Sequence, residues 1–380
     1  MAKQEVRVTR LLGNGVFFGS DSLEQSDHGT LTNPFAEDIA LIREGLFDWA
    51  SFSSEAVDLW QDYVPGPDIL ERPRPTPEEL KSLEWSSLVR EEHTGAHLTR
   101  HIKEAWDIWE EFQRGETTLH PYVVMAGTMG SGKTLFGNAL NRARPAVCKH
   151  YPEMYEDNPD IQAFYSLLAG FTDPAIRGSS HFRKWVELLL DIQGDFQGYF
   201  AGLKFLQKAM AMGDLRRYAA IQDVDSGQDG VYFHTQDRLI HNDKLVQELG
   251  IARLENRDSY LRDTCLRTRL LPPNLQKPIM VYVWAPYEVA KARILETRGR
   301  DFENRVPPGY LKALHLNTIQ WMLAMQQAGV PVIIVDAEKT DFRPWQPGRP
   351  AAVDLVWAEI EKAHQELWPQ NEAYGWGGSS

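Results

Sequence analysis

Short apolar runs alternate with longer amphipathic stretches in the second two-thirds of the chain. The runs are rich in apolar or β-branched residues and predict buried strands at 122–126, 230–234, 279–284 and 330–335. Long segments with helical apolar spacing separate these strands. Strands that alternate with helices are typical of a parallel sheet wrapped by helices. From Pro121 onward, the pattern therefore predicts an α/β fold.

The first 118 residues follow a different pattern. Residues 38–52 carry apolar side chains at helical spacing, and five prolines between positions 65 and 77 form a stiff connector. Thr76, Pro77 and Glu79 form a capping box with proline at the first helical position, so helices are expected from there to about Arg114. We predict an α-rich N-terminal extension at 1–118, an α/β domain at 119–370, and a flexible Gly- and Ser-rich tail at 371–380.

Three histidines in the extension recur every four residues, at His93, His97 and His101. On one helix they would share a face, which makes a transition-metal site conceivable. Gly95 interrupts that helix, however, and three ligands from one helix rarely converge on one ion. A solvated polar face is the favoured interpretation.

Composition and charge narrow the functional classes. The 380 residues are 43% hydrophobic and carry a net charge of −13, which suits a globular protein and opposes binding to a polyphosphate chain. Nucleic acid is therefore disfavoured as a partner, although a local basic channel would still be compatible with it. Cys148 and Cys265 lie far apart and suit a reducing compartment. No apolar stretch approaches the length of a membrane span and the N-terminus lacks signal-peptide character, so we predict a cytoplasmic protein without a membrane partner.

The most specific motif lies directly after the first predicted strand. Residues 127–134 read Gly-Thr-Met-Gly-Ser-Gly-Lys-Thr, a complete G-x-x-x-x-G-K-[ST] phosphate loop, and helical spacing follows at 135–140. Lys133 would reach the terminal phosphates, and the hydroxyl of Thr134 would ligate Mg²⁺. Backbone amides at the helix N-terminus would close around phosphate oxygens, and the loop positions expected to do so are Gly127, Gly130, Ser131 and Gly132. An ordinary Gly-rich turn would rarely match all these positions between a strand and a helix, so we predict a nucleoside triphosphate site.

Phosphoryl transfer also needs carboxylates for Mg²⁺ and the acceptor, and cations for the transferring group. Glu153 lies about where a second strand should end, and Asp237-Arg238 follow the predicted strand 230–234. Arg293, Arg298 and Arg300 cluster around a glycine, just after a helix that begins near position 287. Each feature alone has an ordinary explanation as a solvated loop or a surface turn. Their order along the chain is more informative.

That order resembles the deoxynucleoside kinase family over about 122–342. After the phosphate loop, this family has a glutamate that follows the second strand, an E-x-x-x-D-N-P stretch, and a helix with F-Q-x-Y. An acidic-Arg-Ser motif comes next, with an aspartate six residues past the acid, and then an R-G-R-x-E-E lid and a Tyr-Leu-x-x-Leu-His segment. The matching segments here are 153–159 with Phe164-Tyr165, Phe196-Gln197-Gly198-Tyr199, Asp237-Arg238 with Asp243, 298–303 and 310–315.

The resemblance implies a P-loop kinase that uses ATP and Mg²⁺. Asp237 would hold Mg²⁺ through water together with Thr134, and Arg293 would join the phosphate loop in binding ATP. Arg298 and Arg300 would close over the transferring phosphoryl group and supply positive charge where negative charge develops.

The resemblance also implies roles at the acceptor end. Glu153 would accept the proton of a nucleoside 5′-hydroxyl, and Arg238 would bind the acceptor oxygen and phosphate. The remaining contacts are expected from Gln197, Asp243 and Phe196 to the base, and from Tyr165 and Glu303 to the sugar 3′-hydroxyl.

The acceptor end departs from the family pattern at several positions. Leu239 replaces the serine of the acidic-Arg-Ser motif, Phe302 replaces the first glutamate of the lid, and Gln247 stands where a second stacking phenylalanine is expected. The spacing between Tyr165 and Gln197 is longer than in the family. The nucleotide end therefore matches better than the acceptor end.

Three functions remain open at this point. The first is a kinase that transfers the γ-phosphate of ATP to a hydroxyl of a (deoxy)nucleoside, with a homodimer as a compatible assembly. The second is a kinase of the same fold that acts on a modified base or hydroxyl within DNA, which the net charge disfavours. The third is a non-enzymatic subunit of a larger assembly, like the accessory subunit of respiratory complex I. Intact charged groups such as Lys133, Glu153 and Arg300 argue against this third function.

Overall fold

A computed structural model describes residues 8–11, 65–66, 69–82, 95–153, 159–224, 226–251, 270–297, 306–338, 340 and 352–369. The predicted helix at 38–52, the lid at 298–303 and the tail at 371–380 lie outside these ranges. Within them, no helix combines the length and apolarity needed to cross a membrane.

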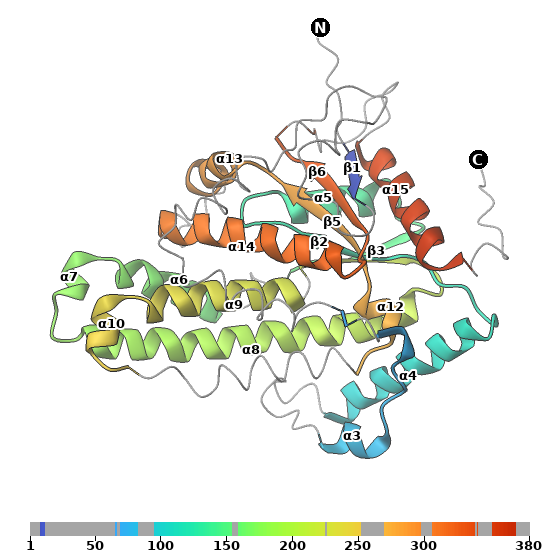
Figure 1. The fold of residues 1–380 in the computed structure, drawn as a ribbon, viewed down its shortest axis with the longest axis horizontal. Coiled ribbons are helices and arrows are strands. Elements are labelled where there is room, and N and C mark those ends of the chain that lie inside the picture. Colours follow the sequence, from blue (N-terminus) through green and yellow to red (C-terminus); the bar gives the residue numbers. More distant parts are fainter. Residues whose placement is uncertain are drawn as a thin grey trace, which may run out of the picture.

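The described part of the chain contains one six-stranded sheet with the order β1-β6-β5-β2-β4-β3 (Figure 1). Strands β2 to β6 run parallel to their neighbours, and β1 lies antiparallel beside β6. This arrangement confirms the predicted α/β fold with a parallel sheet flanked by helices. The strands are β1 (Val8–Leu11), β2 (Tyr122–Ala126), β3 (Cys148–Tyr151), β4 (Ala219–Asp223), β5 (Ile279–Trp284) and β6 (Val332–Asp336).

The predicted strands at 122–126 and 279–284 are confirmed, and the last strand is found at Val332–Asp336. The predicted strand at 230–234 is wrong, because these residues lie inside helix α9 (Ser226–His241). Helix α9 is buried on all sides, so its apolar run lacks the polar face by which an amphipathic helix is recognised. The true strand is β4, whose Ala-Ala-Ile-Gln-Asp sequence is poor in β-branched residues. Pairing with β2 and β3 on its two sides makes it a strand.

Helices cover both faces of the sheet. Figure 1 shows α14 (Pro308–Gln327), α9 and α8 (Phe182–Asp214) on one side, and α5 (Lys133–Ala143) and α15 (Ala352–Leu367) on the other. Alternate side chains of β5 point to opposite faces of the sheet. Met280 and Tyr282 pack with α9 and α14, whereas Val281 and Val283 pack with α5 and α15. A sheet buried on both faces explains the continuous apolar runs in the sequence.

Further elements complete the described fold. They are η1 (Ile69–Glu71), α3 (Pro77–Ser82), α4 (Gly95–Gln113), α6 (Pro159–Phe171), α7 (Pro174–Arg177), α10 (Lys244–Glu248), α12 (Pro273–Gln276), α13 (Tyr287–Ala292) and the π-helical segment η3 (Arg293–Thr297).

The described parts of the N-terminal region pack onto the α/β domain. Helix α4 buries Trp106 and Trp109 against the second half of α8, and the indole N–H of Trp106 donates to the Leu270 carbonyl at 2.7 Å. Strand β1 extends the sheet itself. The predicted capping box at α3 is confirmed, because the amide of Glu79 donates to Thr76 Oγ1 at 3.2 Å and the Glu79 carboxylate accepts from the Thr76 amide at 2.7 Å.

The described ranges contain no group of three or more His, Cys, Asp or Glu side chains arranged to hold a metal ion. Helix α4 begins at Gly95, and His101 pairs with Glu104 on the next turn at 3.2 Å. His93 lies outside the described ranges.

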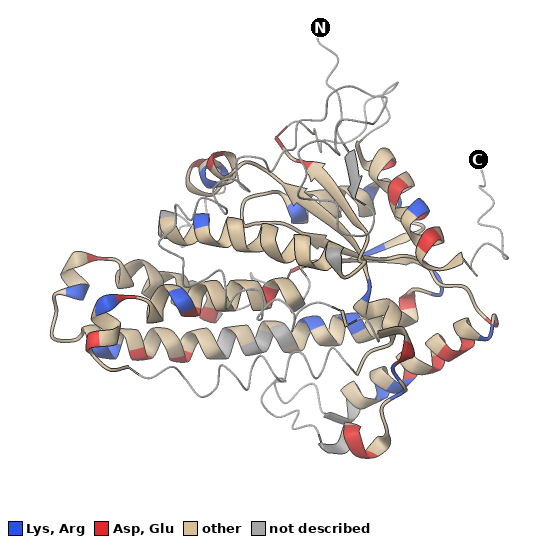
Figure 2. Ribbon diagram, viewed as in Figure 1, with Lys and Arg blue, Asp and Glu red and all other residues tan. Residues whose placement is uncertain are grey.

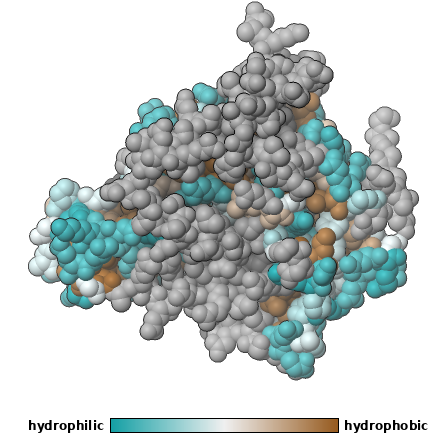
Figure 3. Space-filling model, in the orientation of Figure 1, coloured by the Kyte–Doolittle hydropathy of each residue, from teal (hydrophilic) through white to brown (hydrophobic). Residues whose placement is uncertain are grey.

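Charged side chains lie mainly on helices and at strand ends, and the strands in Figure 2 are almost entirely uncharged. The described atoms visible in Figure 3 are mainly hydrophilic, with apolar atoms in small groups between them. Large exposed apolar side chains such as Leu188 and Met210, both on α8, occur singly along the chain.

Candidate active site

The phosphate loop connects the carboxyl end of β2 to the start of α5. Three of its glycines have positive φ angles, +146° at Gly127, +80° at Gly130 and +99° at Gly132. A Cβ at Gly127 would lie 2.4 Å from the carbonyl oxygen of Val283, and a Cβ at Gly130 would lie 2.5 Å from that of Ala290. Only glycine fits this close approach of the loop to β5 and α13.

Lys133 and Thr134 are the first two residues of α5, so both lie at the helix N-terminus with its unpaired amides. Lys133 is buried, and Thr134 is partly exposed. The hydroxyl of Ser131 is buried and accepts or donates no hydrogen bond within the described ranges. The loop therefore offers amide, ammonium and hydroxyl donors at one point.

Arg293 connects the phosphate loop to the end of the sheet. Its guanidinium donates to the carbonyl oxygen of Ser131 at 3.2 Å and to that of Ala337, just beyond β6, at 2.8 Å. The geometry makes Arg293 a support of the loop backbone, next to the position where phosphates are expected.

A cluster of three charged side chains lies at the same edge of the sheet. Glu153 follows β3 by two residues, as predicted for the glutamate after the second strand. The ammonium of Lys204, on α8, lies 2.5 Å from Oδ1 of Asp229, on α9, and 3.8 Å from Oε1 of Glu153. The Lys204 and Asp229 side chains are only 3% and 5% exposed, and that of Glu153 is 18% exposed.

No motif in the sequence identifies Lys204 or Asp229. Helical spacing could have indicated Lys204, because this residue follows Gln197 by seven positions and lies on the same face of α8. Asp229 and Gln236 are likewise seven residues apart on α9, and Gln197 donates to Gln236 Oε1 at 3.1 Å. The two helices are therefore antiparallel, and their facing pairs are Lys204 with Asp229 and Gln197 with Gln236.

Asp223 ends β4 and is fully buried. Its Oδ1 atom accepts from Nε2 of His150 at 3.0 Å, and its Oδ2 atom has no hydrogen-bond partner in the described part of the chain. A Cβ at Gly137 would lie 3.0 Å from Asp223 Oδ1. Gly137 is three residues after Thr134 on the same face of α5, so this carboxylate lies against the first turns of the helix that carries Thr134.

The placement of Asp237 and Arg238 differs from the prediction. Both were expected to follow a strand, but they lie buried inside α9. The start of α9 touches the phosphate loop, where the amide of Gly127 donates to Gln228 Oε1 at 3.3 Å. Asp237 is nine residues further along the helix, roughly 14 Å away along its axis, and it pairs with His241 at 3.4 Å.

Asp223, in contrast, does lie at the end of a strand, β4. The next residue is Val224, with φ +61°, and an aspartate six residues past the acid is Asp229. Counted from Asp223, the positions of the arginine and the serine in the expected acidic-Arg-Ser pattern are Val224 and Asp225. The predicted strand at 230–234 places this motif fourteen residues later, at Asp237.

The structure does not bring Gln197 and Asp243 together. Asp243 caps α10 by accepting from the amides of Leu245 and Val246 at 3.0 and 3.3 Å, and it pairs with Arg177 at 2.8 Å. Arg177 lies just before α8, whereas Gln197 lies fifteen residues into that helix, about 22 Å along its axis. The described contacts of Asp243 are structural.

Comparison with known proteins shows the family of the chain. A family model described as deoxynucleoside kinase matches residues 123–349, more than half of the chain. The chain belongs to the deoxynucleoside kinase family. One similar solved structure is described as deoxyadenosine kinase from M. mycoides with bound dATP; it is 16% identical, with 63% of this chain and 99% of that chain covered and a TM-score of 0.39. No curated protein matches the chain.

Other residues expected at the acceptor end of this nucleoside kinase are only partly described. Tyr165 is buried on α6 and shares a hydrogen bond with Tyr310 of α14, whose hydroxyl also accepts from Gln236 Nε2 at 3.1 Å. Burial raises the pKa of Tyr310 above its usual range. Phe196 lies on α8, but its side chain is outside the described part of the structure, as are Arg298, Arg300 and Glu303.

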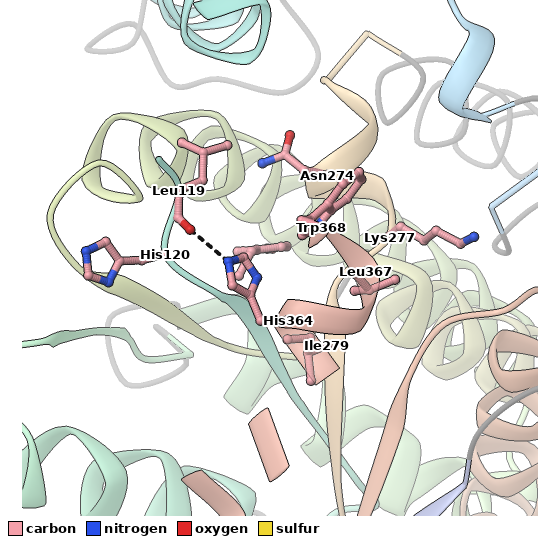
Figure 4. A pocket seen from close by; sticks show the side chains of 9 residues that line it. Leu119, His120, Asn274, Lys277, Ile279, His364, Leu367 and Trp368 are labelled. Carbon is pink, nitrogen blue, oxygen red and sulfur yellow. Dashed lines mark hydrogen bonds between the residues drawn. The ribbon is translucent and has the colours of Figure 1, made fainter. Parts of the chain in front are cut away.

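A separate cavity lies at the opposite edge of the kinase sheet (Figure 4). Tyr122 and Ile279, the first residues of β2 and β5, line it, whereas the phosphate loop is at the carboxyl ends of the strands. His364 lines it too, and its Nε2 donates to the carbonyl oxygen of Leu119 at 2.7 Å. Burial lowers the pKa of His364 to about 4, so the fold holds this imidazole neutral. This cavity is not the nucleotide site.

Proposed function

We propose that this kinase transfers the γ-phosphate of ATP to the 5′-hydroxyl of a (deoxy)nucleoside with the aid of Mg²⁺. The observation that carries the proposal is the Glu153–Lys204–Asp229 cluster at the sheet edge that also carries the phosphate loop. A nucleoside bound there would have its hydroxyl next to a carboxylate. The same hydroxyl would face the terminal phosphate of ATP. Family membership supplies the reaction class, and the cluster supplies the acceptor chemistry.

At the nucleotide end, the amides of 127–132 and the ammonium of Lys133 would hold the phosphates. Arg293 would keep the loop in shape through its bonds to Ser131 and Ala337. Arg298 and Arg300 are proposed from the family resemblance to close over the transferring group.

The residues present fit a magnesium ion. Mg²⁺ prefers hard oxygen ligands and keeps several waters, and P-loop enzymes hold it with the loop Ser or Thr and an aspartate after a strand. Thr134 offers a hydroxyl, and the buried Oδ2 atom of Asp223 lacks a hydrogen-bond partner among the described residues. We therefore assign to Asp223 the role predicted for Asp237. When bound, the ion supplies charge neutralisation to the phosphates.

At the acceptor end, Glu153 is proposed as the general base. The 5′-oxygen of the nucleoside forms a bond to the γ-phosphorus, the bond from this phosphorus to the β,γ-bridging oxygen breaks, and ADP leaves with that electron pair. The proton of the hydroxyl passes to the Glu153 carboxylate. Lys204 attracts this carboxylate and brings a buried cation to the site, whose motif arginine is replaced by Val224.

Recognition of the nucleoside is proposed for the facing surfaces of α8 and α9. Gln197 offers both a donor and an acceptor to a base edge, and Asp229 takes the place that was expected for Asp243. From the family resemblance, Phe196 would stack on the base, and Tyr165 and Glu303 would contact the 3′-hydroxyl.

The test is an assay with γ-labelled ATP over a panel of nucleosides, nucleotides and DNA. We expect label on at least one nucleoside, recovered at the 5′ position, and no transfer by Lys133→Ala, which should keep the same far-ultraviolet circular dichroism. Label on DNA alone would support the polymer kinase instead. No transfer to any acceptor by a folded protein would support a non-enzymatic subunit.

A further inference from the structure

We propose that His150 and Asn138 form a positioning relay that aims the carboxylate of Asp223 at the magnesium site. The inference rests on the proposed function, in which Asp223 and Thr134 hold the ion. It assigns a role to two side chains that the family motifs leave without one.

The relay joins three elements of the fold. Nε2 of His150, on β3, lies 3.0 Å from Oδ1 of Asp223, on β4, and Nδ1 of His150 lies 3.2 Å from Oδ1 of Asn138, on α5. The His150 and Asp223 side chains are 4% and 0% exposed. The contact between them is therefore shielded from bulk solvent, where a hydrogen bond is electrostatically stronger than in water and holds its geometry.

The chemistry of the pair leaves one oxygen for a ligand. A carboxylate oxygen only accepts, so the Nε2–H group of His150 donates to Oδ1. This bond fixes the plane of the carboxylate and leaves the buried Oδ2 atom without a hydrogen-bond partner in the described structure. The side-chain amide of Asn138 offers both a donor and an acceptor, so it can pair with Nδ1 whether or not this nitrogen carries a hydrogen.

Gly137 shows that the pair is fitted to the phosphate-loop helix. A Cβ there would lie 2.8 Å from His150 Nε2, closer than Cβ atoms come to other atoms, and 3.0 Å from Asp223 Oδ1, which is also a tight contact. Gly137 and Asn138 follow Thr134 by three and four residues, which puts all three within about one turn of α5. One turn of helix thus positions the hydroxyl ligand, admits the carboxylate and anchors the imidazole.

Such outer partners orient metal ligands, and their loss typically weakens metal binding roughly 10–100-fold. A purely structural His–Asp pair would behave differently. Its loss would lower the stability of the protein without changing its affinity for a metal ion.

The experiment measures binding of Mn²⁺, a spectroscopic substitute for Mg²⁺, by electron paramagnetic resonance in the presence of saturating ADP. We expect His150→Leu to weaken Mn²⁺ binding at least about tenfold, and His150→Gln, which keeps an N–H near the Nε2 position, to restore most of it. Nucleotide binding measured in EDTA should match the wild type in both variants. Asn138→Leu should weaken Mn²⁺ binding in the same direction.

An Mn²⁺ dissociation constant unchanged in His150→Leu, or unchanged in Asn138→Leu if the first variant fails to fold, would overturn the relay. Failure of the proposed function looks different. In that case the wild type still binds Mn²⁺ with ADP but labels no nucleoside. Asp223→Asn and Asp237→Asn serve as a matched pair, since only the first should lose the ion.

Discussion

Lys204 of α8 donates to the carboxylate of Asp229 of α9 across 2.5 Å, deep between two antiparallel helices. This contact sets the register in which Gln197 meets Gln236, and it places an ammonium 3.8 Å from Glu153. Three buried or half-buried charges thus meet beside the phosphate loop. Burying a charged group costs free energy unless an opposite charge pairs with it. Because such groups gather at functional sites, this association at the predicted catalytic edge points to a role in the reaction.

Glu153→Gln tests the proposed base. The amide keeps the shape of the side chain but accepts no proton, so turnover should fall by roughly 10²–10⁴-fold. Affinity for ATP, measured by calorimetry without acceptor, should stay within twofold of the wild type because Glu153 lies outside the phosphate loop. If turnover survives and only the nucleoside KM rises, Glu153 binds substrate and another group takes the proton.

Lys204→Met tests the buried cation. Its removal leaves the carboxylates of Asp229 and Glu153 near each other without their counter-ion, so we expect kcat/KM for the nucleoside to fall at least about tenfold. Lys204→Arg, which keeps the charge, should retain more activity. Lys208→Met is the matched control, because Lys208 is equally buried one turn further along α8 and lies over the Tyr122 ring. Equal losses of kcat/KM in the two methionine variants would show that Lys204 has only a structural role.

Gln197→Ala and Asp243→Ala should separate recognition from structure. Loss of the Gln197 amide leaves polar partners unpaired, at a cost of about 1–3 kcal/mol, so nucleoside KM should rise while ATP affinity holds. Asp243→Ala removes the cap of α10 and the partner of Arg177, and should lower unfolding free energy by about 0.5–2 kcal/mol with unchanged kinetics. A nucleoside KM raised by Asp243→Ala would restore the role first predicted for that residue.

His364 should make the fold sensitive to acid. Burial lowers the pKa of His364 to about 4, whereas the unfolded chain takes up this proton near pH 6.5. Stability from this group is therefore complete above pH 6.5 and is lost as the pH falls toward 4, with about 2 kcal/mol lost by pH 5. His364→Gln keeps an N–H for the Leu119 carbonyl and does not titrate. Urea unfolding at pH 7.5 and 5 should show a smaller loss in this variant; an equal loss would place the titration elsewhere.

Some features could be predicted because each depends on neighbours within a few residues. These are the phosphate loop, the bounds of β2 and β5, and the capping box at Thr76. Eight consecutive residues determine the loop, and alternating burial within one strand makes a visible apolar run. The order of motifs also identified the family that the family model matches over 123–349.

Tertiary structure decided the rest. Residues 230–234 looked like a strand because α9 is buried between α8 and α14, and burial on every side hides the helical period. β4 is a strand through its pairing with β2 and β3, not through its own composition.

The proposed assignment of the acidic motif to Asp223 instead of Asp237 has the same reason, since the position of the motif depends on which segment is the strand. The sequence by itself therefore determined the family, the phosphate loop and the glutamate after the second strand, because these are local patterns. Only the tertiary structure brought Glu153, Lys204 and Asp229 together, and His150 to Asp223, because their chain separations of 25 to 76 residues are closed by packing alone.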